Sequence, residues 1–294
     1  ILKRPNLTVL TDVQVDKVLL ENGRATQVSA RWQGAQHTFT AGCEIILCAG
    51  SIGSPGILQR SGIGPRPLLE SLGITVLHEL PGVGGNLQDH LQLRLIFKLT
   101  KARTLNQVAN SVWGKVGMGL RYAYDRSGPL AMAPSQLGAF VKSDPDQLSA
   151  NLQYHVQPLS LERFGEPLHT FPAFTASVCN LRPKSRGRVD IRSANPDDAP
   201  LIDPNYLSHP DDLKVAADAI RLTRRIVASA ALQAFTPEEY LPGKDLQTEQ
   251  ELYDAAARIG TTIFHPVGTC RMGQDAEAVV DAQLRVHGVP GLRV

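Results

Sequence analysis

Apolar and polar positions divide the chain into segments of different periodicity. The β-rich run Leu-Thr-Val-Leu-Thr at residues 7–11 continues through several valines to the dipeptide Asn22-Gly23. Residues 27–40 then alternate loosely between apolar and polar side chains. An Asn-Gly dipeptide between two strand-like runs is typical of a β-hairpin. Residues 7–40 are therefore predicted to form a strand followed by a small antiparallel meander.

The segment 44–50, Glu-Ile-Ile-Leu-Cys-Ala-Gly, has a different pattern. Five apolar residues follow one another, which is typical of a strand buried on both faces. The glycine at its carboxyl end permits a tight exit toward a helix. A strand that turns into a helix in this way is where α/β sheets commonly bind ligands.

Further along, the pattern predicts a sheet with helices on it. The segment at 211–229 begins with a capping signal and a proline, and then repeats apolar residues at helical spacing, so this helix is the most regular expected element. Glycines and prolines at 65–67 and 81–85 indicate loops, and residues 84–90 are interpreted as a domain border. Strands are also expected at 91–98, 151–160, 171–181 and 188–192, and helices at 68–72 and 105–124.

Composition and charge restrict the functional classes. A length of 294 residues allows about two domains. Thirty basic against 28 acidic residues leave a net charge of +2, which does not favour a nucleic-acid partner. No apolar run approaches the roughly 20 residues of a membrane-spanning helix, and the amino end lacks signal-peptide features. We therefore expect a soluble protein without a transmembrane segment.

The four cysteines show neither a zinc-ligand spacing nor a disulfide framework. No metal site is predicted. This usage favours a reducing compartment, and we expect a cytoplasmic protein, with peripheral attachment to an inner membrane left open. Cys270 is interpreted as a packing residue.

Two segments carry candidate chemistry. Residues 49–64 place small residues directly after the buried strand, where backbone can approach a flat ligand, although a turn that only packs a helix onto a sheet has the same pattern. Residues 264–273 hold His265 between Phe264 and Pro266, where a rigid imidazole could act as a base or merely cap a loop. The dinucleotide fingerprint Gly-x-Gly-x-x-Gly is absent.

Taken in this order, the two segments resemble those of the glucose-methanol-choline (GMC) flavin oxidoreductases. The resemblance extends over nearly the whole chain, because residues 6–20, 81–90 and 185–187 are also similar to segments of that family. It implies an α/β fold of mixed α+β character, with a partial FAD-binding, Rossmann-like domain and an antiparallel-sheet substrate domain with helices. The implied domains are FAD-binding at 1–89, substrate-binding at 90–245, and a return to the FAD domain at 246–294.

The resemblance also implies site residues. The family's FAD-adenine contact falls on Val15, and Ala49 and Gly50 match the turn beside the flavin nucleotide. His265 matches the active-site histidine over the isoalloxazine ring, with Phe264 as a substrate contact. The implied reaction transfers hydride from a primary alcohol to flavin N5, with His265 as the base, and gives an aldehyde. The electron acceptor is left open among oxygen, a quinone and a protein.

The same resemblance places a glycine-rich pyrophosphate loop before Ile1, and a second catalytic His or Asn after Val294. An isolated fragment of this kind is expected to bind FAD poorly and to lack full activity. Two alternatives are a hydroxynitrile lyase-like enzyme that keeps FAD and a non-catalytic substrate or interaction domain. The strand 151–160 carries Tyr154 but no acid to hold a quaternary ammonium, so a neutral alcohol is favoured over choline.

Overall fold

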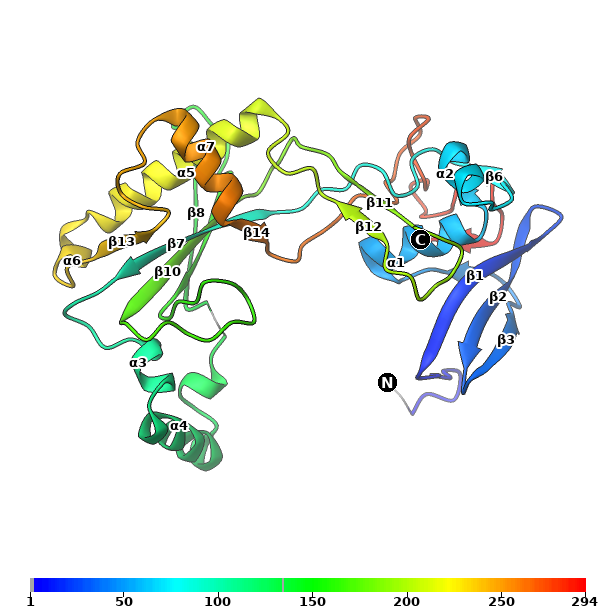
Figure 1. Ribbon diagram of the computed structural model, residues 1–294. Helices are drawn as coiled ribbons and strands as arrows, with labels where there is room; N and C mark the ends of the chain where they lie inside the picture. The colour runs from blue at the N-terminus through cyan, green and yellow to red at the C-terminus, as the bar shows by residue number, and fades with distance from the viewer. Residues whose placement is uncertain (1–2, 134) are drawn as a thin grey trace. The chain divides into compact units, whose positions relative to one another are not determined.

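The computed structural model describes residues 3–133 and 135–294 (Figure 1). The chain forms two compact units, each built from separate stretches of sequence. Unit 1 contains the described residues up to Gln88, Arg186–Asn205 and Pro266–Val294, and unit 2 contains Asp89–Ser185 and Tyr206–His265. The expected section before Ile1 lies outside the described residues.

Unit 1 combines a small antiparallel sheet with short parallel pairs. β1 (Val13–Glu21), β2 (Arg24–Trp32) and β3 (Ala35–Thr40) form the predicted meander, with the Asn22-Gly23 turn between β1 and β2. The remaining elements are β4 (Ile45–Ile46), α1 (Gly50–Arg60), β5 (Ile63–Gly64), α2 (Arg66–Ser71), β6 (His78–Glu79), β11 (Arg188–Asp190), β12 (Leu201–Asp203) and β15 (Leu292–Arg293). β4 pairs in parallel with β15, and β5 with β6.

The core of unit 1 joins the amino-terminal sheet to the carboxyl-terminal segment. Val18 of β1, Leu47 after β4, Leu58 of α1 and Val279 lie in one buried apolar cluster. Burial of such side chains is the main stabilising contribution of each unit. The amino-terminal and carboxyl-terminal stretches of unit 1 are therefore held together by a common core.

Unit 2 is built on one antiparallel sheet. Its strands are β7 (Leu91–Lys98), β8 (Leu137–Val141), β9 (Leu152–Gln157), β10 (Ala173–Asn180), β13 (Glu238–Leu241) and β14 (Gly260–Thr262). The order is β13-β7-β10-β9-β8, and β14 also pairs with β7. The helices are α3 (Leu105–Ala109), α4 (Val112–Asp125), α5 (Pro210–Val227), α6 (Ala230–Gln233) and α7 (Glu249–Ile259), with a 3₁₀ turn at Pro129–Ala131.

The two faces of this sheet differ in chemistry. Alternate residues such as Leu93, Tyr154 and Val178 pack against α5 and α7, which lie along one face in Figure 1. The residues between them, including Arg94 and His155, point to the opposite face, because side chains alternate along a strand. This second face is polar.

Several expectations are corrected by the structure. Residues 7–11 form no strand, and Leu7 and Val9 are 39% and 55% exposed, so their β propensity is not supported by burial. The strand expected within 44–50 is reduced to Ile45–Ile46. The helix expected at 105–124 is divided in two, because Ser111 caps a new helix and accepts a hydrogen bond from Gly114 N.

The mixed α and β fold class is confirmed. The division into units differs from the expected boundaries at two places. Residues 186–205 lie in unit 1, where β11 packs beside α1, and residues 246–265 lie in unit 2, where α7 packs on α5 and β14 pairs with β7. The first boundary, between Gln88 and Asp89, lies at the expected border.

Candidate functional site

His265 is the last residue of unit 2 and follows β14. Its backbone N–H donates to Asp89 Oδ1 at 3.0 Å, and its Nδ1 lies 3.4 Å from His90 Nδ1. The two imidazole rings meet edge to face, with centroids 5.5 Å apart. The His265 ring is exposed, and its Nε2 makes no hydrogen bond with the described residues. Nε2 is therefore the atom available to a substrate.

Asp89 holds this arrangement together. Its buried carboxylate accepts hydrogen bonds from the backbone N–H groups of His90 and His265, at 2.9 and 3.0 Å. Thr262 Oγ1 donates to Oδ2 at 2.5 Å, and the Tyr206 hydroxyl donates to the same oxygen. Burial and the hydrogen bond to Asp89 raise the pKa of Tyr206, so this hydroxyl stays protonated and keeps donating. Four donors fix one carboxylate.

A third histidine lies near this pair. His155 is on β9, and its pKa is lowered by burial and by the proximity of His265 and His90. Its Nε2 is buried and has no hydrogen-bond partner within residues 3–133 and 135–294. Three imidazoles therefore share one region of unit 2, and the lowered pKa keeps His155 neutral at pH 7.

Phe264, the expected substrate contact, is strained and exposed. Its φ is +63°, a left-handed conformation that is rare for a bulky residue, and 68% of its surface is accessible. Its ring lies 5.9 Å from that of Phe164, centroid to centroid. Both rings line a cavity of about 600 Å³ in unit 2, together with Arg94 and Thr262. Phe264 thus lies at a cavity beside His265.

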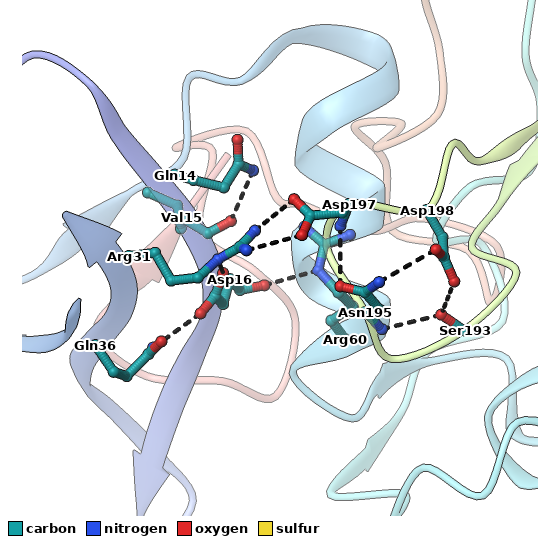
Figure 2. Close-up of polar contacts among 10 residues, drawn as sticks. All are labelled: Gln14, Val15, Asp16, Arg31, Gln36, Arg60, Ser193, Asn195, Asp197 and Asp198. Carbon is teal, nitrogen blue, oxygen red and sulfur yellow. Dashed lines mark hydrogen bonds and ion pairs between the residues drawn. The ribbon is translucent and has the colours of Figure 1, made fainter. Parts of the chain in front are cut away.

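Val15, the expected adenine contact, lies at a β-bulge in unit 1. The pairing of β1 with β2 runs from Val15↔Ala30 to Lys17↔Ser29, so Asp16 is an extra residue. Figure 2 shows the polar contacts around this bulge, where Arg60 Nε donates to Asp16 O at 2.8 Å. A bulge leaves backbone groups outside the strand ladder.

Near the bulge, the meander is fastened to the segment that precedes β12. Arg31 of β2 forms a two-pronged ion pair with Asp197, at 2.7 and 2.6 Å (Figure 2). The Asp197 backbone N–H in turn donates to Asn195 Oδ1 at 3.2 Å. The pair is exposed, so we assign it an orienting role rather than a large contribution to stability.

Ala49 and Gly50 lie at the start of α1, directly after the short strand β4. Gly50 has φ +74°, and a Cβ at this position would meet no atom within 4 Å. Both residues are exposed, and no side chain caps the helix N-terminus. The turn therefore presents open space beside Gly50, which suits the close approach of a ligand, while the Ala49 N–H donates to Ser54 Oγ at 3.2 Å.

The segment that follows His265 is attached to the same helix. Ser51 Oγ donates to Pro266 O at 2.6 Å, and Thr269 Oγ1 donates to Ser51 O at 2.7 Å. Gly84 allows this loop to be closely packed, because its N–H donates to Thr269 O and an added Cβ would lie 2.2 Å from Val189 O. The loop at 266–269 is thus hydrogen-bonded to the first turn of α1.

The structure brings some predicted residues together and reveals others that were missed. Ala49 and Gly50 are adjacent in unit 1, and Val15 packs against the apolar core of that unit. Phe264 and His265 lie in unit 2. Asp89 and His90 were included in the stretch 81–90 but were given no role. His155 and Arg94 were missed, although a charged residue between leucines in β7 is a visible signal.

Two family models described as GMC oxidoreductase match the chain, one over residues 1–92 and the other over residues 183–294. The chain belongs to the GMC oxidoreductase family. Among the GMC relatives, an oxygen-dependent choline dehydrogenase of Ectopseudomonas mendocina (strain ymp) is 40% identical over 99% of this chain and 52% of its own length. An alcohol dehydrogenase [acceptor] of Pseudomonas putida is 39% identical over 100% of this chain and 54% of its own.

The fold is also similar to that of a solved structure. An FAD-dependent oxidoreductase from Chaetomium thermophilum superposes with a TM-score of 0.86 at 26% identity, over 99% of this chain and 57% of that one. The chain spans about half the length of the curated relatives that it matches. Within the described residues, no helix is long and apolar enough to cross a bilayer, and no group of three His, Cys, Asp or Glu side chains could hold a metal ion.

Proposed function

We propose that the protein carrying this chain is an FAD-dependent oxidoreductase that acts on the CH–OH group of an alcohol. Membership of the GMC oxidoreductase family and the likeness to an FAD-dependent oxidoreductase support the cofactor. The single observation on which the proposal rests is His265, an exposed imidazole with its backbone fixed by Asp89 and Nε2 free for a substrate hydroxyl.

In this proposal, unit 1 binds FAD and unit 2 binds the alcohol. Val15 would contact the adenine through its backbone, while Ala49 and Gly50 would lie beside the nucleotide, where the open space at Gly50 fits a flat ligand. The bound flavin supplies an acceptor for the hydride that leaves the alcohol carbon. The protein's own contribution is to orient the alcohol and receive its proton.

His265 performs the proton transfer as a general base. A neutral imidazole nitrogen can accept a hydroxyl proton from a substrate within hydrogen-bond reach. The contact between Nδ1 of His265 and Nδ1 of His90 directs Nε2 toward the substrate. A primary alcohol that loses a proton and a hydride becomes an aldehyde.

The test is anaerobic reduction of the flavin by a panel of alcohols. The reduction is monitored as a loss of flavin absorbance. His265→Gln in the full-length protein should slow reduction by roughly 10²–10⁴-fold and leave the flavin content unchanged. His37→Gln, a histidine of β3, is the matched control and should reduce normally. Unchanged reduction in His265→Gln would reject the base, whereas flavin that no alcohol reduces would favour a lyase-like or non-catalytic protein.

Two accompanying properties belong to the same proposal. The four cysteines are free, which supports a reducing compartment such as the cytoplasm. Oxygen uptake during turnover, compared with reduction of a quinone or of an added protein acceptor, identifies the electron acceptor.

A further inference from the structure

Arg94 is a buried cation at the centre of the unit 2 sheet. It lies in β7 between Leu93 and Leu95, and only 4% of its surface is accessible. Arginine is rarely buried to this extent unless it is paired. The residue therefore requires a partner for its charge.

The described residues provide no carboxylate for Arg94. Its Nη2 lies 3.5 Å from Gln157 Oε1, at the limit of a hydrogen bond, and the guanidinium carbon lies 4.4 Å from the centre of the Phe164 ring. Nε and Nη1 are buried with no hydrogen-bond partner. Three donor N–H groups are thus left unsatisfied, since Nε carries one and Nη1 two.

Neutralisation does not resolve this unpaired charge. Burial lowers the pKa of Arg94, but a guanidinium keeps its proton at any physiological pH. An uncompensated charge in a dry interior is strongly unfavourable, which is why buried charges are paired or bind ligands. The unsatisfied donors indicate a place for an anion.

The neighbours of Arg94 on the adjacent strands of the polar face are uncharged. Arg94 pairs in register with Ser177, and Ser177 pairs with His155. Both neighbours also carry a buried polar atom without a partner, as does Gln92. Because its pKa is lowered, His155 is neutral at pH 7 and adds no competing charge. Arg94 is the charged member of this row of orphaned polar groups.

The cavity that Arg94 lines is predominantly cationic. It measures about 600 Å³ and contains three arginines, Arg94, Arg163 and Arg258, against one acid, Glu162. The Glu162 carboxylate is exposed and lies 3.3 Å from His169 Nε2, away from the guanidinium of Arg94. Such a lining attracts anions and repels quaternary ammonium groups.

Two residues that line the cavity are linked to the histidine pair. Thr262 and Phe264, which line it, are neighbours of His265 in sequence, and Thr262 binds the same Asp89 carboxylate as His265. His90 and Arg94 are four residues apart, so their Cα atoms lie ~13 Å apart along an extended chain. A flexible molecule of several carbons can therefore span from His265 to the guanidinium.

We infer that the substrate is a hydroxy-carboxylate, and that Arg94 pairs with its carboxylate while the hydroxyl at the other end reaches His265. This inference rests on the proposed alcohol oxidation, and it replaces the expectation of a neutral alcohol with that of an anionic one. A two-pronged guanidinium–carboxylate contact would satisfy the donors that are unpaired in the protein alone. Phe164 and Phe264 would cover the apolar middle of the molecule.

Binding is tested first, without turnover. Hexanoate, a carboxylate that has no hydroxyl to oxidise, is titrated into the full-length protein by calorimetry. Hexanoate should bind, and Arg94→Gln should weaken it by at least about tenfold, with Arg94→Lys intermediate. Arg225→Gln, an exposed position on α5, is the surface control and should bind hexanoate as the unaltered protein does. Circular dichroism of each variant verifies folding.

Turnover is tested second, with 6-hydroxyhexanoate, 1-hexanol and choline. The hydroxy-carboxylate should exceed 1-hexanol in kcat/KM by on the order of 10²-fold, and Arg94→Gln should remove this advantage. If hexanoate does not bind, or if 1-hexanol or choline is the better substrate, the inference is wrong although alcohol oxidation stands. If hexanoate binds through Arg94 but no alcohol reduces the flavin, the anion site stands and the proposed function fails.

Discussion

The carboxylate of Asp89 accepts a hydrogen bond from the backbone N–H of His265 at 3.0 Å, across 176 positions of sequence. Its second oxygen binds Thr262 and Tyr206, so the carboxylate cannot turn without breaking several contacts. A base works well only if it is held within a fraction of an ångström of the reacting proton. Asp89 is therefore a positioning residue for His265.

Asp89→Asn should lower kcat by on the order of 10²-fold, because the amide cannot accept from two donors at each end and the His265 backbone shifts. Bound flavin, measured by its absorbance after release, should remain at the normal level, and KM should change less than kcat. Asp125→Asn on the surface of α4 is the control. A variant with full kcat would contradict the positioning role.

His155 makes the stability of unit 2 dependent on pH. Its pKa is lowered from the ordinary value near 6.5 by burial and by two neighbouring histidines. Below about pH 6.5 the unfolded chain takes up this proton and the folded chain does not, so the free energy of unfolding falls as pH falls. Above about pH 6.5, where His155 is neutral in both states, the free energy of unfolding is not reduced by this residue.

His155→Gln should reduce the fall in the free energy of unfolding as pH is lowered. Urea denaturation at intervals from pH 5 to pH 7.5 measures this free energy. The same substitution at His37 should leave the slope unchanged. Equal slopes in His155→Gln and the unaltered protein would show that His155 is not the responsible group.

Much of the fold could be predicted from local patterns. The helix expected at 211–229 is observed at Pro210–Val227, because a His209 cap, a proline and a regular apolar stripe all agree. The strand expected at 91–98 has those bounds. The strand predicted at 7–11 is wrong, because these β-forming side chains are exposed and do not pack against another surface.

The site could be predicted only in part, for a physical reason. His265 was found because a proline and glycines constrain it locally, whereas Asp89 acts through hydrogen bonds to residues more than a hundred positions away. The pairing of Arg94 with Ser177 and His155 likewise depends on strand register, which spacing within one segment does not contain. Local pattern can locate a reactive side chain but not its distant supports.

The thiols should divide into two classes. Burial raises the pKa of Cys179 to about 11 and that of Cys270 to about 12, so both remain protonated at pH 8. Cys43 and Cys48 are exposed. Titration with a chromogenic disulfide reagent at pH 8 should show two rapid thiols, and four after denaturation. Rapid modification of Cys270, traced by peptide mapping, would contradict its buried environment.

Gln59 should be a critical buried residue of unit 1. It is fully buried in α1, its Oε1 accepts from Ile191 N at 2.9 Å, and its Nε2 donates to Val189 O at 3.1 Å. Gln59→Leu leaves both backbone groups unpaired and should cost about 2–4 kcal/mol of unfolding free energy. Urea denaturation measures the loss, and Gln14→Leu on the exposed surface of β1 should change stability by less than about 0.5 kcal/mol. A Gln59→Leu variant of unchanged stability would show that these hydrogen bonds contribute nothing net.

The chain passes from one unit to the other four times, after Gln88, Ser185, Asn205 and His265. Each unit is consequently a mosaic, and neither can be produced as one uninterrupted stretch of the gene. A protease that nicks any single crossing liberates no whole unit, because unit 1 is divided in every case and unit 2 either is divided or stays joined to a piece of unit 1. Recombination between relatives at any one of these points would divide unit 1 between two parents, so its separate stretches must remain compatible with one another.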